Sequence, residues 1–236
     1  MVLRSAIFNA VMWCAVAIYA PLALLTAPLP LRWRYRFIVQ WARFHIWLAR
    51  WWLKINYRVE GKANLPSGPA VVLSKHQSAW ETLAYPLIFP RITWILKREL
   101  LWIPLFGWAL ALLKPIAINR RAARRAFEQI TSQGRARLEE GTWVVVFPEG
   151  TRVAPGHRRP YKSGGGALAA KTGYPVVPVA HNAGSFWPRR GFVKNPGTVR
   201  VVIGPVIDSQ GKTAEQITRE AEEWIEKTMV ELEAKA

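Results

Sequence analysis

Short apolar runs alternate with amphipathic segments over most of the chain, and this alternation predicts the fold. Apolar runs bounded by Gly, Pro or charged residues predict strands at 69–74, 92–96, 115–119, 142–147, 174–180 and 198–203. Between them, helical spacing of the apolar positions predicts helices at about 80–88, 122–139 and 163–172. Strands that alternate with helices are typical of α/β proteins, so we expect a mostly parallel central sheet flanked by helices.

The C-terminal quarter of the chain adds two predicted elements. Residues 192–203, FVKNPGTVRVVI, predict a late β-hairpin with a Pro-Gly turn. The sequence TAEQ at 213–216 is a capping-box pattern, which predicts the start of a last helix. That helix carries one apolar stripe and many acidic residues, and we interpret it as an ordinary acidic surface helix.

The N-terminal segment has no charged residue from Ser5 to Leu31, a run of 27 residues. As a helix it would be about 40 Å long, which exceeds the roughly 30 Å of a bilayer's hydrocarbon core. A cleaved signal peptide is an alternative, but the run is long for one and no small-x-small cleavage site stands out. Its three prolines leave a partly inserted two-helix anchor open as well.

The next segment, up to Lys54, combines aromatic and basic residues. Phe37, Trp41, Phe44, Leu48 and Trp51 recur at three- and four-residue spacing, with basic residues between them. This pattern is typical of an amphipathic helix that lies in a membrane interface, although such a face can equally pack on the domain. We therefore expect a membrane anchor over residues 1–56 and one globular domain over 57–236.

The distribution of basic residues bears on the orientation in the membrane. Arg32, Arg34 and Arg36 follow the apolar segment, whereas only Arg4 precedes it. Because cytoplasmic flanks of membrane segments are enriched in Lys and Arg, we expect the inner (cytoplasmic) membrane, with the globular domain facing the cytoplasm. Nine of the 13 tryptophans lie within the first 102 residues, which also favours an interfacial location.

The net charge of +18 is concentrated before Lys212, where 29 basic side chains face 8 acidic ones. A body this basic favours an anionic partner, such as nucleic acid, an anionic membrane, a phosphorylated substrate or an acidic carrier protein. One class of function that this charge allows is a basic membrane-associated or nucleic-acid-binding protein without catalysis. The chain has no recognisable nucleic-acid-binding module, and its apolar segment argues against that alternative, so we expect no nucleic acid.

Candidate chemistry begins with SKHQSAWETL, residues 74–83. His76 directly follows a predicted strand, at the sheet edge where α/β proteins bind ligands. Five helical residues turn through about 500°, so His76 and Glu81 can meet only if His76 lies in the turn that leads into the helix. A carboxylate on the ring would fix the tautomer and stabilise the imidazolium of a general base. Spacing alone favours a solvated His76–Glu81 pair, because H-x4-E is a weak pattern.

Two other predicted strands end in residues suited to phosphate. The sequence FPEGTR at 147–152 offers a glycine that allows close backbone approach and, in Arg152, a fork for a phosphate group. The sequence PIAINRR places Arg120 after the 115–119 strand. We expect Arg120 and Arg152 to bind a phosphate and Arg121, Arg124 and Arg125 to form a solvated helix face. Four scattered histidines and one cysteine, Cys14, predict no metal site, and we expect no cofactor.

The blocks KHQSAWE, AINR, FPEGTR and VVPVA, in this order, resemble the four motif blocks of the glycerolipid acyltransferases. The similarity is greatest to the 1-acyl-sn-glycerol-3-phosphate acyltransferase (lysophosphatidic acid acyltransferase) family and covers about residues 60–205. It implies that His76 is the catalytic base and Glu81 its orienting partner, and that Pro178 supports the acyl side. It further implies that the acceptor is bound or shaped by Arg120, Glu149, Gly150, Thr151, Arg152 and Lys162.

The resemblance also implies the reaction and its partners. An acyl chain would pass from an acyl thioester, either acyl-CoA or acyl carrier protein, to the sn-2 hydroxyl of lysophosphatidic acid, giving phosphatidic acid in phospholipid biosynthesis at the membrane lipids. The family's usual first block is H-x4-D, whereas this chain has H-x4-E. The longer carboxylate leaves open another lysolipid acceptor, such as a lyso-aminolipid, or glycerol 3-phosphate. The chain has no G-x-S-x-G elbow, so we expect direct transfer rather than a covalent intermediate.

Overall fold

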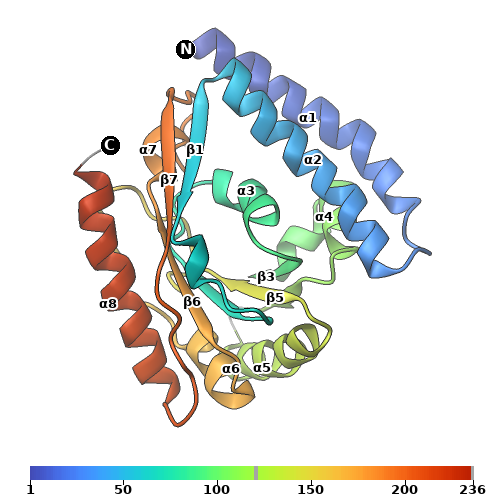
Figure 1. Ribbon diagram of the computed structural model, residues 1–236. Coiled ribbons are helices and arrows are strands. Elements are labelled where there is room, and N and C mark those ends of the chain that lie inside the picture. Colours follow the sequence, from blue (N-terminus) through green and yellow to red (C-terminus); the bar gives the residue numbers. More distant parts are fainter. Residues whose placement is uncertain (120–121, 235–236) are drawn as a thin grey trace.

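A seven-stranded sheet separates two layers of helices in the computed structural model, which describes residues 1–119 and 122–234 (Figure 1). The strand order is β1-β7-β6-β2-β5-β3-β4. Strands β2 to β6 pair only in parallel with one another, whereas β7 runs antiparallel to β6 and parallel to β1. The expected mostly parallel sheet is therefore confirmed. The strands are β1 (Ile55–Glu60), β2 (Val71–Ser74), β3 (Ile92–Lys97), β4 (Ile116–Ile118), β5 (Trp143–Val146), β6 (Val176–His181) and β7 (Gly197–Ile203).

The central strands are apolar throughout because both of their faces are covered. In β2, Val71 and Leu73 belong to one apolar cluster, while Val72 between them belongs to the other. The same alternation divides β5, where Val145 points away from its two neighbours. Continuous apolar runs of this kind are expected for parallel strands that are buried on both sides.

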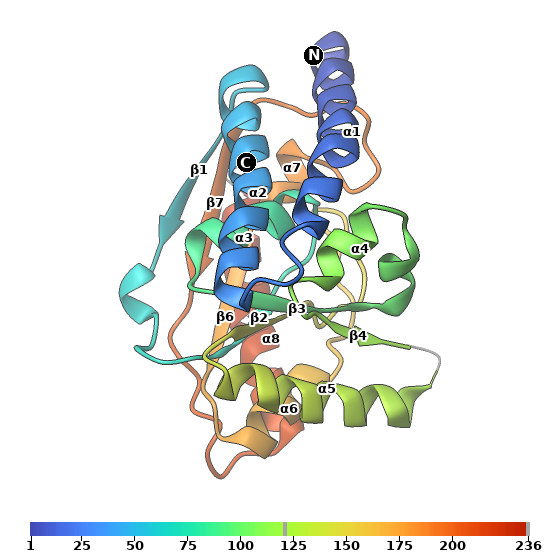
Figure 2. The same cartoon turned by 90° about the vertical axis from the view of Figure 1, so that its right-hand side faces the viewer.

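The helices divide between the two faces of the sheet (Figures 1 and 2). Apolar residues of α5, α6 and α8 pack into the cluster on one face, and those of α2 and α3 pack into the cluster on the other. The helices are α1 (Val2–Leu24), α2 (Leu31–Trp52), α3 (Trp80–Ile88), α4 (Phe106–Ala111), α5 (Ala123–Glu139), α6 (Gly164–Thr172), α7 (Ala183–Phe186) and α8 (Ala214–Glu233), with short 3-10 turns at Lys62–Asn64 and Arg98–Trp102.

Helices α1 and α2 form an antiparallel pair that lies across the outside of the α3 layer (Figure 1). Helix α1 is long and apolar enough to cross a membrane, which weakly suggests membrane association. The buried face of α2 is built mainly from small or aliphatic side chains such as Ala42, Ile46 and Ala49. Its exposed large hydrophobic side chains are aromatic: Trp33, Phe44, Trp47, Trp51 and Trp52. One face of α2 thus packs on the domain, and another face points outward.

Several elements of the fold differ from the expectation. Strand β1 was not predicted, and neither was α4. The late β-hairpin is wrong, because β7 pairs with β6 and β1 and no strand lies at 192–194 within the described residues. The backbone N–H of Lys194 instead donates to Ser5 Oγ at 3.0 Å, so this segment seats α1 rather than pairing with β7.

Candidate active site

Three neighbouring parallel strands end at the same edge of the sheet, and their C-terminal loops form the candidate site. Strand β2 is the central strand and lies between β5 and β6. Residues 75–79 follow β2, and the FPEGTR turn at 147–152 follows β5. The structure therefore brings the first and third sequence blocks together, as parallel pairing of β2 and β5 requires.

His76 and Glu81 form a hydrogen-bonded pair. His76 Nδ1 lies 2.8 Å from Glu81 Oε1, with His76 in the turn before α3 and Glu81 in the first turn of that helix. This is the one arrangement that their spacing allowed. An ionised carboxylate can only accept hydrogen bonds, so the ring donates from Nδ1–H and leaves Nε2 available to accept a proton.

Glu81 is fully buried, and its position is fixed by further donors. The backbone N–H groups of Gln77 and Ser78 donate to the same oxygen, Oε1, at 3.0 and 2.8 Å. Burial raises the pKa of Glu81, but the two nearby histidines, His181 and His76, and the Ser78 N–H outweigh it, and the pKa lies below the ordinary value of 4.5. Glu81 is therefore a charged carboxylate at neutral pH.

A second histidine, His181 at the end of β6, lies behind the pair. Its Nε2–H donates to the Lys75 carbonyl at 2.9 Å, and its Nδ1 accepts the Ala183 N–H at 3.2 Å. Complete burial lowers the pKa of His181, so the ring is neutral at physiological pH. Sequence reasoning missed this residue, which contacts the loop that carries His76, residues 75–79, through the Lys75 carbonyl.

The ring of His76 also stacks on Phe147, the first residue after β5. The two ring centroids are 3.9 Å apart and the planes differ by 14°. The His76 side chain is 14% exposed, so it is held in place on one side and still accessible to a ligand. Two constraints, the Glu81 carboxylate and the Phe147 face, thus set the orientation of the imidazole.

The FPEGTR turn connects this pair to a basic cavity. Gly150 adopts a φ of 72°, a conformation that side chains other than glycine rarely adopt. Glu149 points inward: its Oε1 accepts from Lys75 Nζ at 2.8 Å and its Oε2 accepts from the His76 N–H at 3.3 Å. Burial raises the pKa of Glu149 despite these partners. Glu149 thus contacts the loop at residues 75–79 itself, in addition to lining the cavity.

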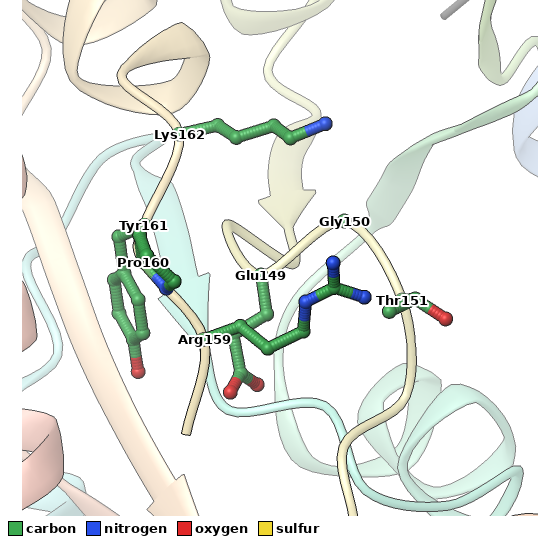
Figure 3. A pocket seen from close by; sticks show the side chains of 7 residues that line it. All are labelled: Glu149, Gly150, Thr151, Arg159, Pro160, Tyr161 and Lys162. Carbon is green, nitrogen blue, oxygen red and sulfur yellow. The ribbon is translucent and has the colours of Figure 1, made fainter.

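The cavity has a volume of about 370 Å³ and is lined by Glu149, Gly150, Thr151, Arg159, Pro160, Tyr161 and Lys162 (Figure 3). Arg159 and Lys162 come from the same segment, and their side chains extend toward the Gly150 turn, as Figure 3 shows. Two cations beside a glycine turn are suited to binding a phosphate group. Sequence reasoning included Lys162 but missed Arg159, whose only signal was its place in the basic run HRRPYK.

The remaining predicted residues lie in different places. Arg152 is not among the described residues that line the cavity, and its carbonyl accepts from Arg189 Nη1 at 2.6 Å. Pro178 is buried inside β6 opposite Leu73 of β2, and its carbonyl accepts the Gly204 N–H at 2.9 Å. Arg120, predicted to bind a phosphate, lies outside the described residues. Within those residues no cluster of three or more His, Cys, Asp or Glu side chains could hold a metal ion.

Comparisons with known proteins place this geometry in a family. Residues 56–182 match the acyltransferase family. The chain is 46% identical to a 1-acyl-sn-glycerol-3-phosphate acyltransferase from Pseudomonas aeruginosa, over 98% of this chain and 91% of that protein. It is 32% identical to the human protein of the same name, form alpha, over 69% of this chain and 59% of that protein.

A solved structure is similar along the whole chain. The crystal structure of the 1-acyl-sn-glycerophosphate acyltransferase from Thermotoga maritima superposes with a TM-score of 0.81 at 26% identity, and covers 98% of this chain and 95% of that one. The likeness therefore includes the α1–α2 pair as well as the sheet and its helices.

Proposed function

The chain belongs to the 1-acyl-sn-glycerol-3-phosphate acyltransferase family, and on this premise we propose how its residues carry out the reaction. The enzyme transfers an acyl chain to 1-acyl-sn-glycerol 3-phosphate, giving phosphatidic acid in phospholipid biosynthesis. The observation that supports the assignment of roles is the 2.8 Å contact between His76 Nδ1 and Glu81 Oε1 beside a cavity with two cations. His76 is the catalytic base and Glu81 is its orienting partner.

The chemical step is a direct transfer between two bound substrates. His76 Nε2 takes the proton from the sn-2 hydroxyl as that oxygen attacks the thioester carbonyl. A C–O bond forms, the C–S bond of the tetrahedral intermediate breaks, and the imidazolium returns its proton to the leaving thiolate. Glu81 stabilises the imidazolium between these two proton transfers. A positioned general base of this kind contributes about 10²–10⁴ in rate.

The acceptor's phosphate binds in the cavity next to the FPEGTR turn. Arg159 and Lys162 supply its charge partners, and Gly150 and Thr151 supply the turn that the phosphate approaches. Arg152 and Arg120 remain proposed phosphate ligands, and Pro178 a proposed support on the acyl side. The longer side chain of Glu81 reaches the ring without loss of contact, so the H-x4-E block is a working variant of the family's usual pair.

The acyl donor is a thioester of coenzyme A or of acyl carrier protein. Both donors carry negative charge, and the strongly basic body of the chain complements either of them. The fold does not decide between the two donors, because the same imidazole serves both. An activity assay with each donor does.

The α1–α2 pair supports the proposed membrane location. Helix α1 is tied to the domain by polar contacts: Lys194 Nζ donates to Asn9 Oδ1 at 2.7 Å, and Trp52 Nε1 donates to the Arg4 carbonyl at 3.0 Å. A separate spanning helix would have to break these contacts and expose Asn9 to hydrocarbon, which is costly. We infer that the pair inserts into one leaflet of the cytoplasmic membrane and that the domain lies on the cytoplasmic side.

The test is an acceptor and donor panel with the purified full-length protein in mixed micelles. We expect thiol release from acyl-CoA, or from acyl carrier protein, only when 1-acyl-glycerol 3-phosphate is present. Glycerol 3-phosphate and a lyso-aminolipid serve as competing acceptors. A preference of more than about tenfold for either competitor would contradict the proposed acceptor, since tenfold corresponds to about 1.4 kcal/mol of transition-state discrimination.

A further inference from the structure

Helix α8 contacts the catalytic loop, residues 75–79, on both sides of His76. We propose that α8 is a positioning element for the catalytic base and acts through the carboxylates of Glu226 and Glu233. The proposal rests on the proposed function, because it requires His76 to be the base. It also corrects the interpretation of the last helix as an ordinary acidic surface helix.

The first contact is to Lys75, the residue before His76. Lys75 is 1% exposed, and its ammonium donates to three acceptors: Glu149 Oε1 at 2.8 Å, Glu226 Oε1 at 2.9 Å and the His157 carbonyl at 3.2 Å. An ammonium has three N–H donors, so this set satisfies all of them. The Tyr161 hydroxyl donates to the same oxygen of Glu226 at 2.9 Å, which ties α8 to the wall of the basic cavity.

The second contact is to Gln77, the residue after His76. The side chain of Gln77 is buried; its Nε2 donates to Glu233 Oε1 at 2.9 Å, and its Oε1 accepts the Gly184 N–H at 3.2 Å. Glu233 Oε2 accepts the Gly156 N–H at 2.8 Å. Glu226 and Glu233 are seven residues apart, about two turns, so both project from one face of α8 toward the loop.

Lys75 also takes part in the contacts that hold the backbone of the catalytic loop. The Lys75 carbonyl accepts from His181, and the His76 N–H donates to Glu149, which is itself paired with Lys75. Displacement of Lys75 would therefore disturb both of these contacts, which help to place the His76 ring. An error of about 1 Å in the position of a catalytic group can cost about a hundredfold in rate.

Stability alone does not account for these charges. Helix α8 is already held on the sheet by an apolar stripe that includes Ile217, Ala221, Ile225, Met229 and Leu232, all of them buried. A buried ion pair adds little net stability compared with a well-packed apolar pair, because both charges lose their hydration. What the two carboxylates add to that apolar packing is a defined position for the loop.

The experiment compares Glu226→Ala and Glu233→Ala with Glu223→Ala, a matched control on the exposed face of α8. Alanine is the best helix former, so none of the three changes weakens the helix itself. We expect kcat for acyl transfer to fall about tenfold or more in the first two variants, with KM for both substrates unchanged, and to stay at the wild-type level in the control. The milder variants Glu226→Gln and Glu233→Gln should retain intermediate activity, because an amide keeps part of the hydrogen bonding.

Two further measurements separate positioning from folding. Hydrogen exchange of the peptide that contains residues 74–79 should be faster in both alanine variants and unchanged in the control. In a double-mutant cycle, Gln77→Ala with Glu233→Ala should be no slower than Gln77→Ala alone, because Glu233 acts through Gln77. Should an alanine variant fail to fold, the glutamine variants carry the same comparison.

Kinetics that match the control in both alanine variants, with kcat within about twofold, would overturn the proposal. So would a fall in Tm with unchanged kcat per folded molecule, because that is the result of a purely structural role. A wild-type protein without acceptor-dependent transfer would instead contradict the proposed function. An active wild type with an inactive His76→Ala variant and fully active α8 variants would contradict only the role of α8.

Discussion

Replacing Glu81 with glutamine tests the division of labour within the His76–Glu81 pair. Glu81 Oε1 accepts three N–H donors, from His76, Gln77 and Ser78. The amide oxygen of a glutamine can take over all three, so the loop and the tautomer of His76 should survive. The substitution removes the negative charge next to the ring and places an NH2 group at Oε2, a buried atom with no hydrogen-bond partner among the described residues.

The size of the effect follows from that charge. At an effective dielectric constant of about 20, two unit charges about 4 Å apart interact by about 4 kcal/mol. Part of this is regained, because the amide still accepts a neutral hydrogen bond worth about 1 kcal/mol. The remaining loss of about 3 kcal/mol in stabilisation of the imidazolium corresponds to a fall in kcat of about a hundredfold, since about 1.4 kcal/mol corresponds to tenfold.

The assay is steady-state thiol release from acyl-CoA with 1-acyl-glycerol 3-phosphate at saturation. We expect kcat to fall by about two orders of magnitude while KM for the acceptor stays within about twofold, because the lost interaction exists only after proton transfer. Glu81→Asp is the companion variant: it keeps the charge but is one methylene shorter, and it should retain a measurable part of the activity. A Glu81→Gln enzyme with a kcat within about fivefold of the wild type would refute the reasoning.

Three further predictions follow from the site and its supports. Arg159→Ala and Lys162→Ala should each raise KM for 1-acyl-glycerol 3-phosphate about tenfold or more with a small effect on kcat, as measured by steady-state kinetics, because each removes a charge-assisted hydrogen bond to the phosphate; an unchanged KM would place the phosphate elsewhere. Gly166→Ala should lower the free energy of unfolding by about 1–3 kcal/mol in urea titrations, because its Cβ would meet the backbone of α8, whereas Gly68→Ala, where the added Cβ meets nothing, should not. The pKa of Glu81 is lower in the folded state, so its contribution to stability is present above the ordinary value of 4.5 and is lost as pH falls through the lower folded pKa. The unfolding free energy of Glu81→Gln should therefore depend less on pH in this acid range than that of the wild type, and equal slopes would contradict the lowered pKa.

The sequence predicted the elements whose signal is local. The helix at 80–88 has the predicted bounds, and the strands of the central sheet lie within two residues of the predicted ends, because each is an apolar run that is closed by Gly, Pro or charge. Helix geometry also predicted where His76 and Glu81 could meet, since it left only the turn before α3, but spacing alone did not predict that they do meet.

The elements that were missed depend on partners far away in the chain. Strand β1 is formed by pairing with β7, about 140 residues later, and the segment before β7 is used to seat α1 instead of forming a hairpin. No local pattern encodes either contact.

The candidate site also contains contacts between distant segments that the sequence could not predict. The sequence placed Glu149 in the acceptor site but could not show that its carboxylate turns inward to Lys75 and the His76 N–H. It also gave no sign that Glu226 and Glu233 differ from the five other acidic residues of the last helix, because only the register of α8 on the sheet decides which carboxylates reach the loop.

The central claim is that the His76 ring is the base, and the rate of His76→Ala tests it most directly. The matched control is His157→Ala, whose exposed ring contacts the Pro155 carbonyl near the cavity. The account predicts that acceptor-dependent thiol release falls by at least about a hundredfold in His76→Ala membranes with equal amounts of folded protein, and that the control stays close to the wild type. Near-normal turnover by His76→Ala would contradict the account.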